Sequence, residues 1–264
     1  MEQWLLLHVP TAVLGFVIVC LSASLSVIGL ILVRRRMPFM VLEQNNEIAG
    51  FFMSIIGTAY AILMAFVIFS TWQKFTAADD AVTAEANSLG DLIRIAQQFP
   101  DPERHELFTR VRAYAVSVTE DEWKAMAHER ASPQAFAALN SMWQAYAAID
   151  PQTNRASALY GEVLRHLGDV SDHRRDRIRA AATTIPGTLW VVLLASGAAT
   201  IGFTYCFAGR NLRTQAIMTA VLGGVIGLLL FVVLEFNLPF TGDISVPPTA
   251  FNQVFKLLDL VGSR

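Results

Sequence analysis

The chain has 264 residues, of which 54% are hydrophobic and 16% are charged, and its mean hydropathy is +0.44. This composition excludes an ordinary soluble domain of the same size and indicates a membrane protein. The net charge of -2 gives no support for a nucleic-acid partner.

Four segments are long and apolar enough to cross a hydrocarbon core about 30 Å thick, which requires roughly 20 residues of helix. They cover residues 10–33, 48–71, 186–208 and 216–236. The first segment is expected to stay in the protein as an anchor, because Glu2 stands where a signal peptide carries basic residues. Cys20 and Cys206 both fall inside spans, so they predict no disulfide framework.

Residues 72–185 hold 13 of the 20 basic and 16 of the 22 acidic residues, and we expect them to form a soluble domain between residues 1–71 and 186–236. The apolar residues of this segment recur with helical spacing. One stripe is Val82, Ala86, Leu89, Ile93 and Ala96, and another is Phe136, Leu139, Trp143 and Tyr146. Breaks at residues 99–103, 131–133 and 149–154 predict four helices. The expected fold is therefore all-α, with the two outer domain helices continuing the second and third spans.

A buried ion pair is predicted between the first and fourth helices of this domain. On a helical wheel Glu85 lies about 60° from Val82, and Arg174 lies on the apolar face of its own helix. If the outer helices continue the spans, the two charges differ in height by only about 5 Å. We therefore predict a Glu85–Arg174 pair, with Arg177 as the alternative partner, since an unpaired buried charge is strongly destabilising. Two charges that snorkel at the edge of the apolar stripes are the other interpretation.

The chain contains no HExxH, Gly-rich phosphate loop, GxSxG or CxxC motif, so we do not expect an enzyme. One helical ridge carries Glu162, His166, Asp169 and His173, a combination that can bind metals inside helical bundles. That ridge lies about 60 to 120° from the apolar stripe of its helix, which favours a solvated face. No catalytic residue, metal or other cofactor is predicted.

The second span has two contrasting faces. Small residues that permit close helix approach in lipid occupy one face, at Gly50, Ser54, Gly57, Ala61 and Ala65. Bulkier residues occupy the opposite face, and four of them are pore-lining candidates: Phe52, Ile56, Ala59 and Leu63. A hydrophobic constriction is one environment for this stripe, and lipid is the alternative.

Small residues also recur in the third and fourth spans, as in Ala195–Thr200 and at Thr219, Gly223 and Gly227. Four helices of one subunit cannot use all of these faces for contacts with one another. The pattern therefore predicts a closed ring of subunits.

The fourth span ends in an unusual turn. Glu235 is predicted to face protein at the membrane boundary, and the Pro and Gly that follow stop the helix. The candidate post-span turn comprises Glu235, Asn237, Pro239, Phe240, Gly242 and Asp243. Its last five residues resemble the N-P-F-G-x-D turn that follows the last span of bestrophins, the pentameric anion channels. The segments "NEIAGFFMSIIGTAYAILMAFVIFSTW", "AEANSLGDLIR", "DEWKAM", "RRDRIRAAATTIPGTLW" and "NLPFTGDISVPP" are similar to the bacterial bestrophin-like family of membrane proteins, in that family's order.

The resemblance implies a four-span subunit of a homopentamer in the bacterial inner membrane, with an axial anion pore whose apolar neck comes from the second span. Membrane lipid, permeant anions and further subunits are the implied partners. Two features depart from the family pattern: Leu238 is inserted in the turn, and "ISVPPTAF" follows Asp243 where eukaryotic bestrophins complete a calcium clasp. Calcium needs six or more oxygen ligands, so calcium gating is not expected. The remaining residues, 237–264, are expected to form the turn and a short amphipathic tail.

Basic residues near the span ends do not decide the orientation. Arg34, Arg35, Arg36, Arg210 and Arg213 lie in the short loops, against Lys74, Arg174, Arg175, Arg177 and Arg179 on the domain side. The resemblance implies a cytoplasmic soluble domain. An ion channel is the first functional hypothesis, and a non-conducting membrane sensor or scaffold whose helical domain binds a partner is the alternative.

Overall fold

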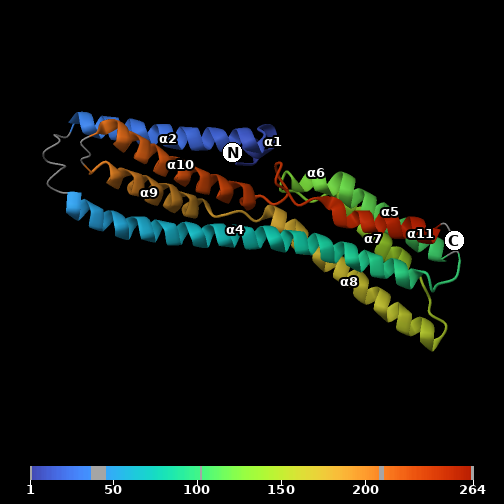
Figure 1. Cartoon of the computed structure of the whole chain (residues 1–264). Coiled ribbons are helices and arrows are strands. Elements are labelled where there is room, and N and C mark those ends of the chain that lie inside the picture. Colours follow the sequence, from blue (N-terminus) through green and yellow to red (C-terminus); the bar gives the residue numbers. More distant parts are fainter. Residues whose placement is uncertain (1, 37–45, 102, 208–210, 263–264) are drawn as a thin grey trace. The chain divides into compact units, whose positions relative to one another are not determined.

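The computed structural model describes residues 2–36, 46–101, 103–207 and 211–262, and all of its regular elements are helices (Figure 1). Four of these helices are long and apolar enough to cross a membrane, which confirms the four predicted spans. They are α2 (Thr11–Arg36), α4 (Asn46–Ala96), α9 (Gly187–Thr204) and α10 (Leu212–Asn237), and the short α1 (Glu2–His8) precedes them. Arg210 and Pro102, which entered the sequence predictions, lie outside the described residues.

The chain forms two compact units. The membrane unit comprises Met1–Gln73, Thr184–Asn237 and Gly242–Ile244, and the helical unit comprises Lys74–Thr183, Leu238–Thr241 and Ser245–Arg264. α4 is one helix of 51 residues and contributes to both units, as the absence of any Pro or turn sequence between Asn46 and Ala96 predicts.

In the membrane unit, α2 and α10 run side by side because small residues remove the bulk between them (Figure 1). A Cβ atom at Gly223 would lie 2.8 Å from the Cβ atom of Ser26 and 3.0 Å from the backbone oxygen of Ser22. The Ser22 hydroxyl donates a 2.6 Å hydrogen bond to the Gly223 carbonyl. Such close approach supplies the van der Waals contact that holds helices together in lipid.

A second contact cluster joins α4, α9 and α10. Its buried residues are Tyr60, Met64, Val67, Leu193, Ile226 and Val233. Gly197 permits the approach, because a Cβ atom there would lie 3.1 Å from the Tyr60 hydroxyl oxygen. The face of α4 that packs within its own subunit is therefore the one that carries Tyr60, Met64 and Val67.

The helical unit contains the last part of α4 and a set of shorter helices. These are α5 (Glu103–Ser117), the π-helical turn η1 (Val118–Glu122), α6 (Trp123–Met126), α7 (Pro133–Ala147), α8 (Asn154–Ala182), the 3₁₀ turn η2 (Pro248–Ala250) and α11 (Phe251–Gly262). Ser132 and Thr153 cap α7 and α8 by accepting hydrogen bonds from the backbone N–H groups of Ala135 and Ala156. These caps explain why the predicted breaks at residues 131–133 and 149–154 start helices.

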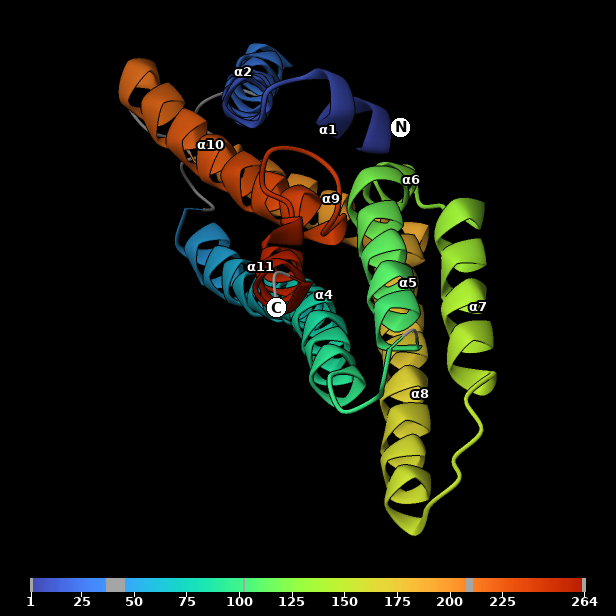
Figure 2. The same cartoon turned by 90° about the vertical axis from the view of Figure 1, so that its right-hand side faces the viewer.

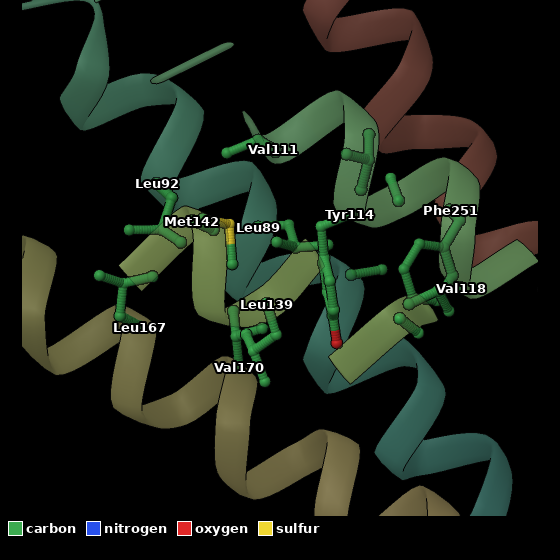
Figure 3. Close-up of a cluster of buried hydrophobic side chains, with 14 of the residues drawn as sticks. Leu89, Leu92, Val111, Tyr114, Val118, Leu139, Met142, Leu167, Val170 and Phe251 are labelled. Carbon is green, nitrogen blue, oxygen red and sulfur yellow. The ribbon is translucent and has the colours of Figure 1, made fainter. Parts of the chain in front are cut away.

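The core of the helical unit brings together residues from α4, α5, η1, α6, α7, α8 and α11, and Figure 3 shows part of it. The fully buried residues include Leu89 and Leu92 of α4, Tyr114 of α5, Val118 of η1, Met142 of α7, Val170 of α8 and Phe251 of α11. α5 and α7 lie side by side (Figure 2), and α11 packs on α5. The predicted stripe of α7 is partly confirmed, because Leu139 and Tyr146 are buried in the core. Phe136 is wrong: it is 54% exposed, and Ala135 and Met142 are buried on this face instead.

The predicted continuity of the fourth domain helix with the third span is wrong. α8 ends at Ala182, Thr183 adopts an extended backbone with ψ of 123°, and α9 begins at Gly187. Pro186 explains the break, because its ring disfavours a helical conformation in the residue before it and it has no N–H group to donate.

Candidate functional site

The most concentrated polar chemistry of the helical unit is a buried network of two carboxylates and two guanidinium groups. Glu85 of α4 and Arg177 of α8 are both fully buried. The Nε atom of Arg177 lies 2.7 Å from Oε2 of Glu85, and its Nη2 atom lies 3.0 Å from Oε1. This two-point contact is the geometry that makes arginine–carboxylate pairs strong.

Glu122, at the end of η1, is the second carboxylate of the network and is also fully buried. It accepts hydrogen bonds from Nη2 of Arg177 at 2.8 Å and from Nε and Nη2 of Arg174 at 3.1 and 2.5 Å. The predicted Glu85–Arg174 pair is therefore wrong in its partner. Arg177, the alternative, binds Glu85, and Arg174 binds Glu122.

Tyr114 of α5 completes the network by donating a 2.6 Å hydrogen bond to Oε1 of Glu85. Burial raises the pKa of Tyr114 well above its usual value, and the charge of Glu85 adds to this shift while Arg177 opposes it. Burial works to lower the pKa of Arg177, but the adjacent Glu85 outweighs it, so that the pKa rises above its usual value. The network thus holds two negative and two positive charges in a neutral, hydrogen-bonded set.

Sequence reasoning missed Glu122, although a signal for it exists. Val118, Glu122 and Met126 are spaced by four residues, and all three are buried. The surrounding acidic residues Glu120 and Asp121 make the stretch look solvent-exposed. The π-helical turn places Glu122 inward. Aromatic rings also flank both arginines, and the ring centroid of Trp123 lies 5.3 Å from the guanidinium carbon of Arg177.

The pore-lining candidates lie on one flank of α4, beside the face that packs within the subunit. Phe52 is 49% exposed and Ala59 is exposed, whereas Ile56 and Leu63 are half-buried at the margin of the packed face. The small residues Ser54, Ala61 and Ala65 on the other flank are exposed as well. The subunit therefore covers a central face of this span and leaves both predicted faces at least partly open.

Several residues of the candidate post-span turn have defined contacts. Asn237 is fully buried and its Oδ1 atom accepts a 2.8 Å hydrogen bond from the backbone N–H of Ile185, in the break between α8 and α9. In the helical unit, Phe240 packs edge-on against Trp123 with ring centroids 5.7 Å apart, and the Pro239 carbonyl accepts a hydrogen bond from the Val246 N–H.

Gly242 and Asp243 belong to the membrane unit. Gly242 has a φ of +85°, which favours glycine, and it packs against Leu6. The Asp243 carboxylate accepts a 2.9 Å hydrogen bond from the backbone N–H of Thr11, the first residue of α2. Glu235 is 1% exposed, as its predicted protein-facing position requires. Both of its carboxylate oxygens are buried, and the side chains of Thr11 and Asp243 lie nearby.

The helical ridge that resembles a metal site is occupied by arginine contacts. Arg165 binds both Glu162 and Asp169 on the same helix face. Among the described residues, no three His, Cys, Asp or Glu side chains are grouped closely enough to hold a metal ion.

The fold and the four apolar spans define an all-helical membrane protein, and comparison with known proteins identifies its family. The bestrophin-like domain matches residues 20–251, so the chain belongs to the bestrophin-like family. This membership agrees with the family resemblance of the sequence segments quoted above. No curated protein sequence matches the chain.

Several solved structures share the fold. A bacterial bestrophin homologue from Klebsiella pneumoniae matches with a TM-score of 0.68 at 17% identity, over 92% of this chain and 98% of that chain. A mutated form of a Klebsiella pneumoniae bestrophin homologue matches with a TM-score of 0.70 at 15% identity, over 91% and 98%. A further structure described as a membrane protein gives 0.69 at 16% identity, over 92% and 98%. At these identities the similarity establishes the fold.

Proposed function

We propose that this chain forms a ring-shaped homo-oligomer, a pentamer, that conducts anions across the bacterial inner membrane with its helical unit in the cytoplasm. The narrowest part of the pathway is the stripe of α4 formed by Phe52, Ile56, Ala59 and Leu63. Membership of the bestrophin-like family supports the channel class, because the family resemblance implies an axial pore lined by the second span.

The open flank of α4 is the observation that carries the proposal. The subunit packs Tyr60, Met64 and Val67 against its other spans, and it leaves Phe52 and Ala59 uncovered. Apolar side chains arranged in a ring narrow a pore and gate it by excluding water. In a ring whose second spans surround the axis, this flank is available for that position.

The charge of α4 is compatible with anion conduction. Between Glu47 and Asp79 the helix carries one charged residue, Lys74. An anion that moves along this helix therefore meets no carboxylate of the same segment. An oligomer would repeat the positive charge of Lys74 once per subunit and so favour anions at that level.

Ion flux into liposomes that contain only the purified protein tests the proposal, with chloride and cation gradients measured separately. Truncating Phe52 and Ile56 to Ala should increase chloride flux at matched protein density, because it widens an apolar constriction. Phe69→Ala is the matched control, since Phe69 is 58% exposed and lies about 100° from Phe52 on the helical wheel.

Each outcome of this comparison separates the hypotheses. Equal flux in the parent and the Phe52/Ile56 variant, in a conducting preparation, places the stripe against lipid. An absence of flux in every preparation favours the non-conducting sensor or scaffold. A monomer or dimer in mass photometry of the detergent-solubilised protein would contradict the ring.

A further inference from the structure

A cavity of about 580 Å³ lies in the membrane unit where α9 ends and α10 begins. Its walls are of two kinds. Phe207, Met218 and Leu222 contribute apolar surface, and Thr204, Asn211, Thr214 and Gln215 contribute polar groups. None of these residues belongs to the α4 stripe or to the turn after α10, so the proposed conduction pathway does not account for this cavity.

The polar end of the cavity is organised by Gln215, which is 8% exposed. Its Nε2 atom donates hydrogen bonds to the carbonyl oxygens of Thr204 at 3.3 Å and Phe207 at 2.7 Å, which lie at and beyond the end of α9. Its Oε1 atom accepts a 2.6 Å hydrogen bond from Nη2 of Arg34. Gln215 thereby fixes the cavity wall and holds a guanidinium group beside it.

Positive charge surrounds this end of the membrane unit. The last turn of α2 carries Arg34, Arg35 and Arg36, and Arg213 precedes the lining residue Thr214. Neither residues 11–36 nor residues 187–234 contain an acidic side chain. Three consecutive arginines are too costly to place in hydrocarbon, so this level of the unit corresponds to the membrane boundary.

The apolar wall extends from this boundary toward the middle of the spans. Thr214, Met218 and Leu222 lie on one face of α10 at four-residue spacing. From Thr214 to Leu222 the helix rises about 12 Å, which is most of the ~15 Å that one leaflet contributes to the hydrocarbon core. The cavity therefore combines a cationic, hydrogen-bonding end at the boundary with an apolar groove that follows the direction of an acyl chain.

We propose that this cavity is a binding site for an anionic phospholipid, with the phosphate-bearing headgroup beside Arg34 and Arg213 and one acyl chain along Met218 and Leu222. Basic pockets between transmembrane helices recognise anionic headgroups by charge, and the hydroxyl of Thr214 supplies a donor for a headgroup oxygen. A zwitterionic lipid with the same chains fills the groove but lacks the net charge that the arginines select.

The test uses the full-length protein, purified in detergent and stripped of lipid. Dioleoyl phosphatidylglycerol or dioleoyl phosphatidylcholine is added back, and bound lipid is counted by native mass spectrometry while the melting temperature is recorded. We expect phosphatidylglycerol to bind and stabilise selectively. Arg213→Gln should weaken that binding about fivefold, the factor that corresponds to the ~1 kcal/mol contributed by one basic residue near an anionic lipid.

Two tryptophan variants locate the site. Met218→Trp fills the groove and should abolish the preference for phosphatidylglycerol. Ile217→Trp adds the same bulk at the adjacent position, which is 64% exposed and does not line the cavity, and it should keep the preference.

Equal binding of the two lipids by the parent protein, or an unchanged preference in Met218→Trp, overturns the proposal. A change of oligomeric state in Met218→Trp, absent in Ile217→Trp, also overturns it, because the cavity would then be a contact between subunits.

Discussion

Replacing Arg177 by methionine removes the charge at the centre of the buried network while it keeps most of the side-chain volume. Arg177 donates three hydrogen bonds to the carboxylates of Glu85 and Glu122. Without Arg177, Glu85 is left buried with Tyr114 as its remaining hydrogen-bond donor in the network, and the set acquires a net negative charge. Breaking a buried ion pair by removing one partner costs about 3–5 kcal/mol.

This cost is large enough to measure by thermal unfolding in detergent. One kcal/mol corresponds to a shift of about 2–4 °C for a protein of similar size, so Arg177→Met should lower the melting temperature by roughly 6–20 °C at a fixed scan rate. Arg175→Met is the matched control on the same helix. Its side chain is 67% exposed and pairs with the exposed Asp172, and such pairs contribute about 0–1 kcal/mol.

A second substitution tests which carboxylate depends on Arg177. Glu85→Gln should recover part of the lost melting temperature in the Arg177→Met background, because it removes the uncompensated charge. The same change should recover less in an Arg174→Met background, since Arg174 binds Glu122. A larger recovery with Arg174→Met would refute the pairing, and a shift for Arg177→Met no greater than that for Arg175→Met would refute the network's contribution.

Two further predictions concern pH and helix packing. Because the pKa of Tyr114 is raised in the folded state, the folded protein keeps a proton that the unfolded chain loses above about pH 10. The free energy of unfolding should therefore fall above that pH by roughly 1.4 kcal/mol per pH unit for this group. Tyr114→Phe should flatten this decline, and an equal slope in both proteins would contradict the assignment. Gly223→Ala should destabilise the protein by about 1–3 kcal/mol through overpacking against Ser22 and Ser26, whereas Gly202→Ala, where nothing lies within 4 Å, should be neutral or stabilising in the same melting assay.

Hydrophobic length and helical periodicity were sufficient to predict the parts of the fold that depend on neighbouring residues. The four spans follow from apolar runs, and the stripe of Val82, Leu89 and Ile93 follows from 3.6-residue spacing, because each residue's environment is set by its own helix. The partner of Glu85 depends on the height of α8, and the predicted height assumes a continuous helix that Pro186 interrupts. Arg177 lies one turn beyond Arg174, so a small error in register was enough to exchange the partners.

The pore-lining stripe illustrates a different limit. Periodicity divided the second span into a small face and a bulky face, but it could not show which part the subunit covers. The packed residues Tyr60, Met64 and Val67 lie between those two faces, because their contacts come from α9 and α10, more than a hundred residues away in the chain. Long-range contacts of this kind leave no trace in the local pattern.

A final prediction concerns Asn237, the last residue of α10, a buried polar residue whose hydrogen-bond partner is a backbone group far away in the sequence. The break between α8 and α9 frees the N–H of Ile185, and Asn237 accepts its hydrogen bond from 52 residues away. Asn237→Leu keeps the side-chain volume and removes the acceptor. It should cost about 1 kcal/mol, the lower end of the penalty for a buried donor left unsatisfied, because this hydrogen bond is part-buried. Asn237→Ala removes volume as well. If the hydrogen bond dominates, Asn237→Leu lowers the melting temperature nearly as much as Asn237→Ala does. If Asn237→Leu is tolerated while Asn237→Ala is not, Asn237 acts through packing. The proposal that its side chain satisfies the backbone N–H freed by the break at Pro186 would then be wrong.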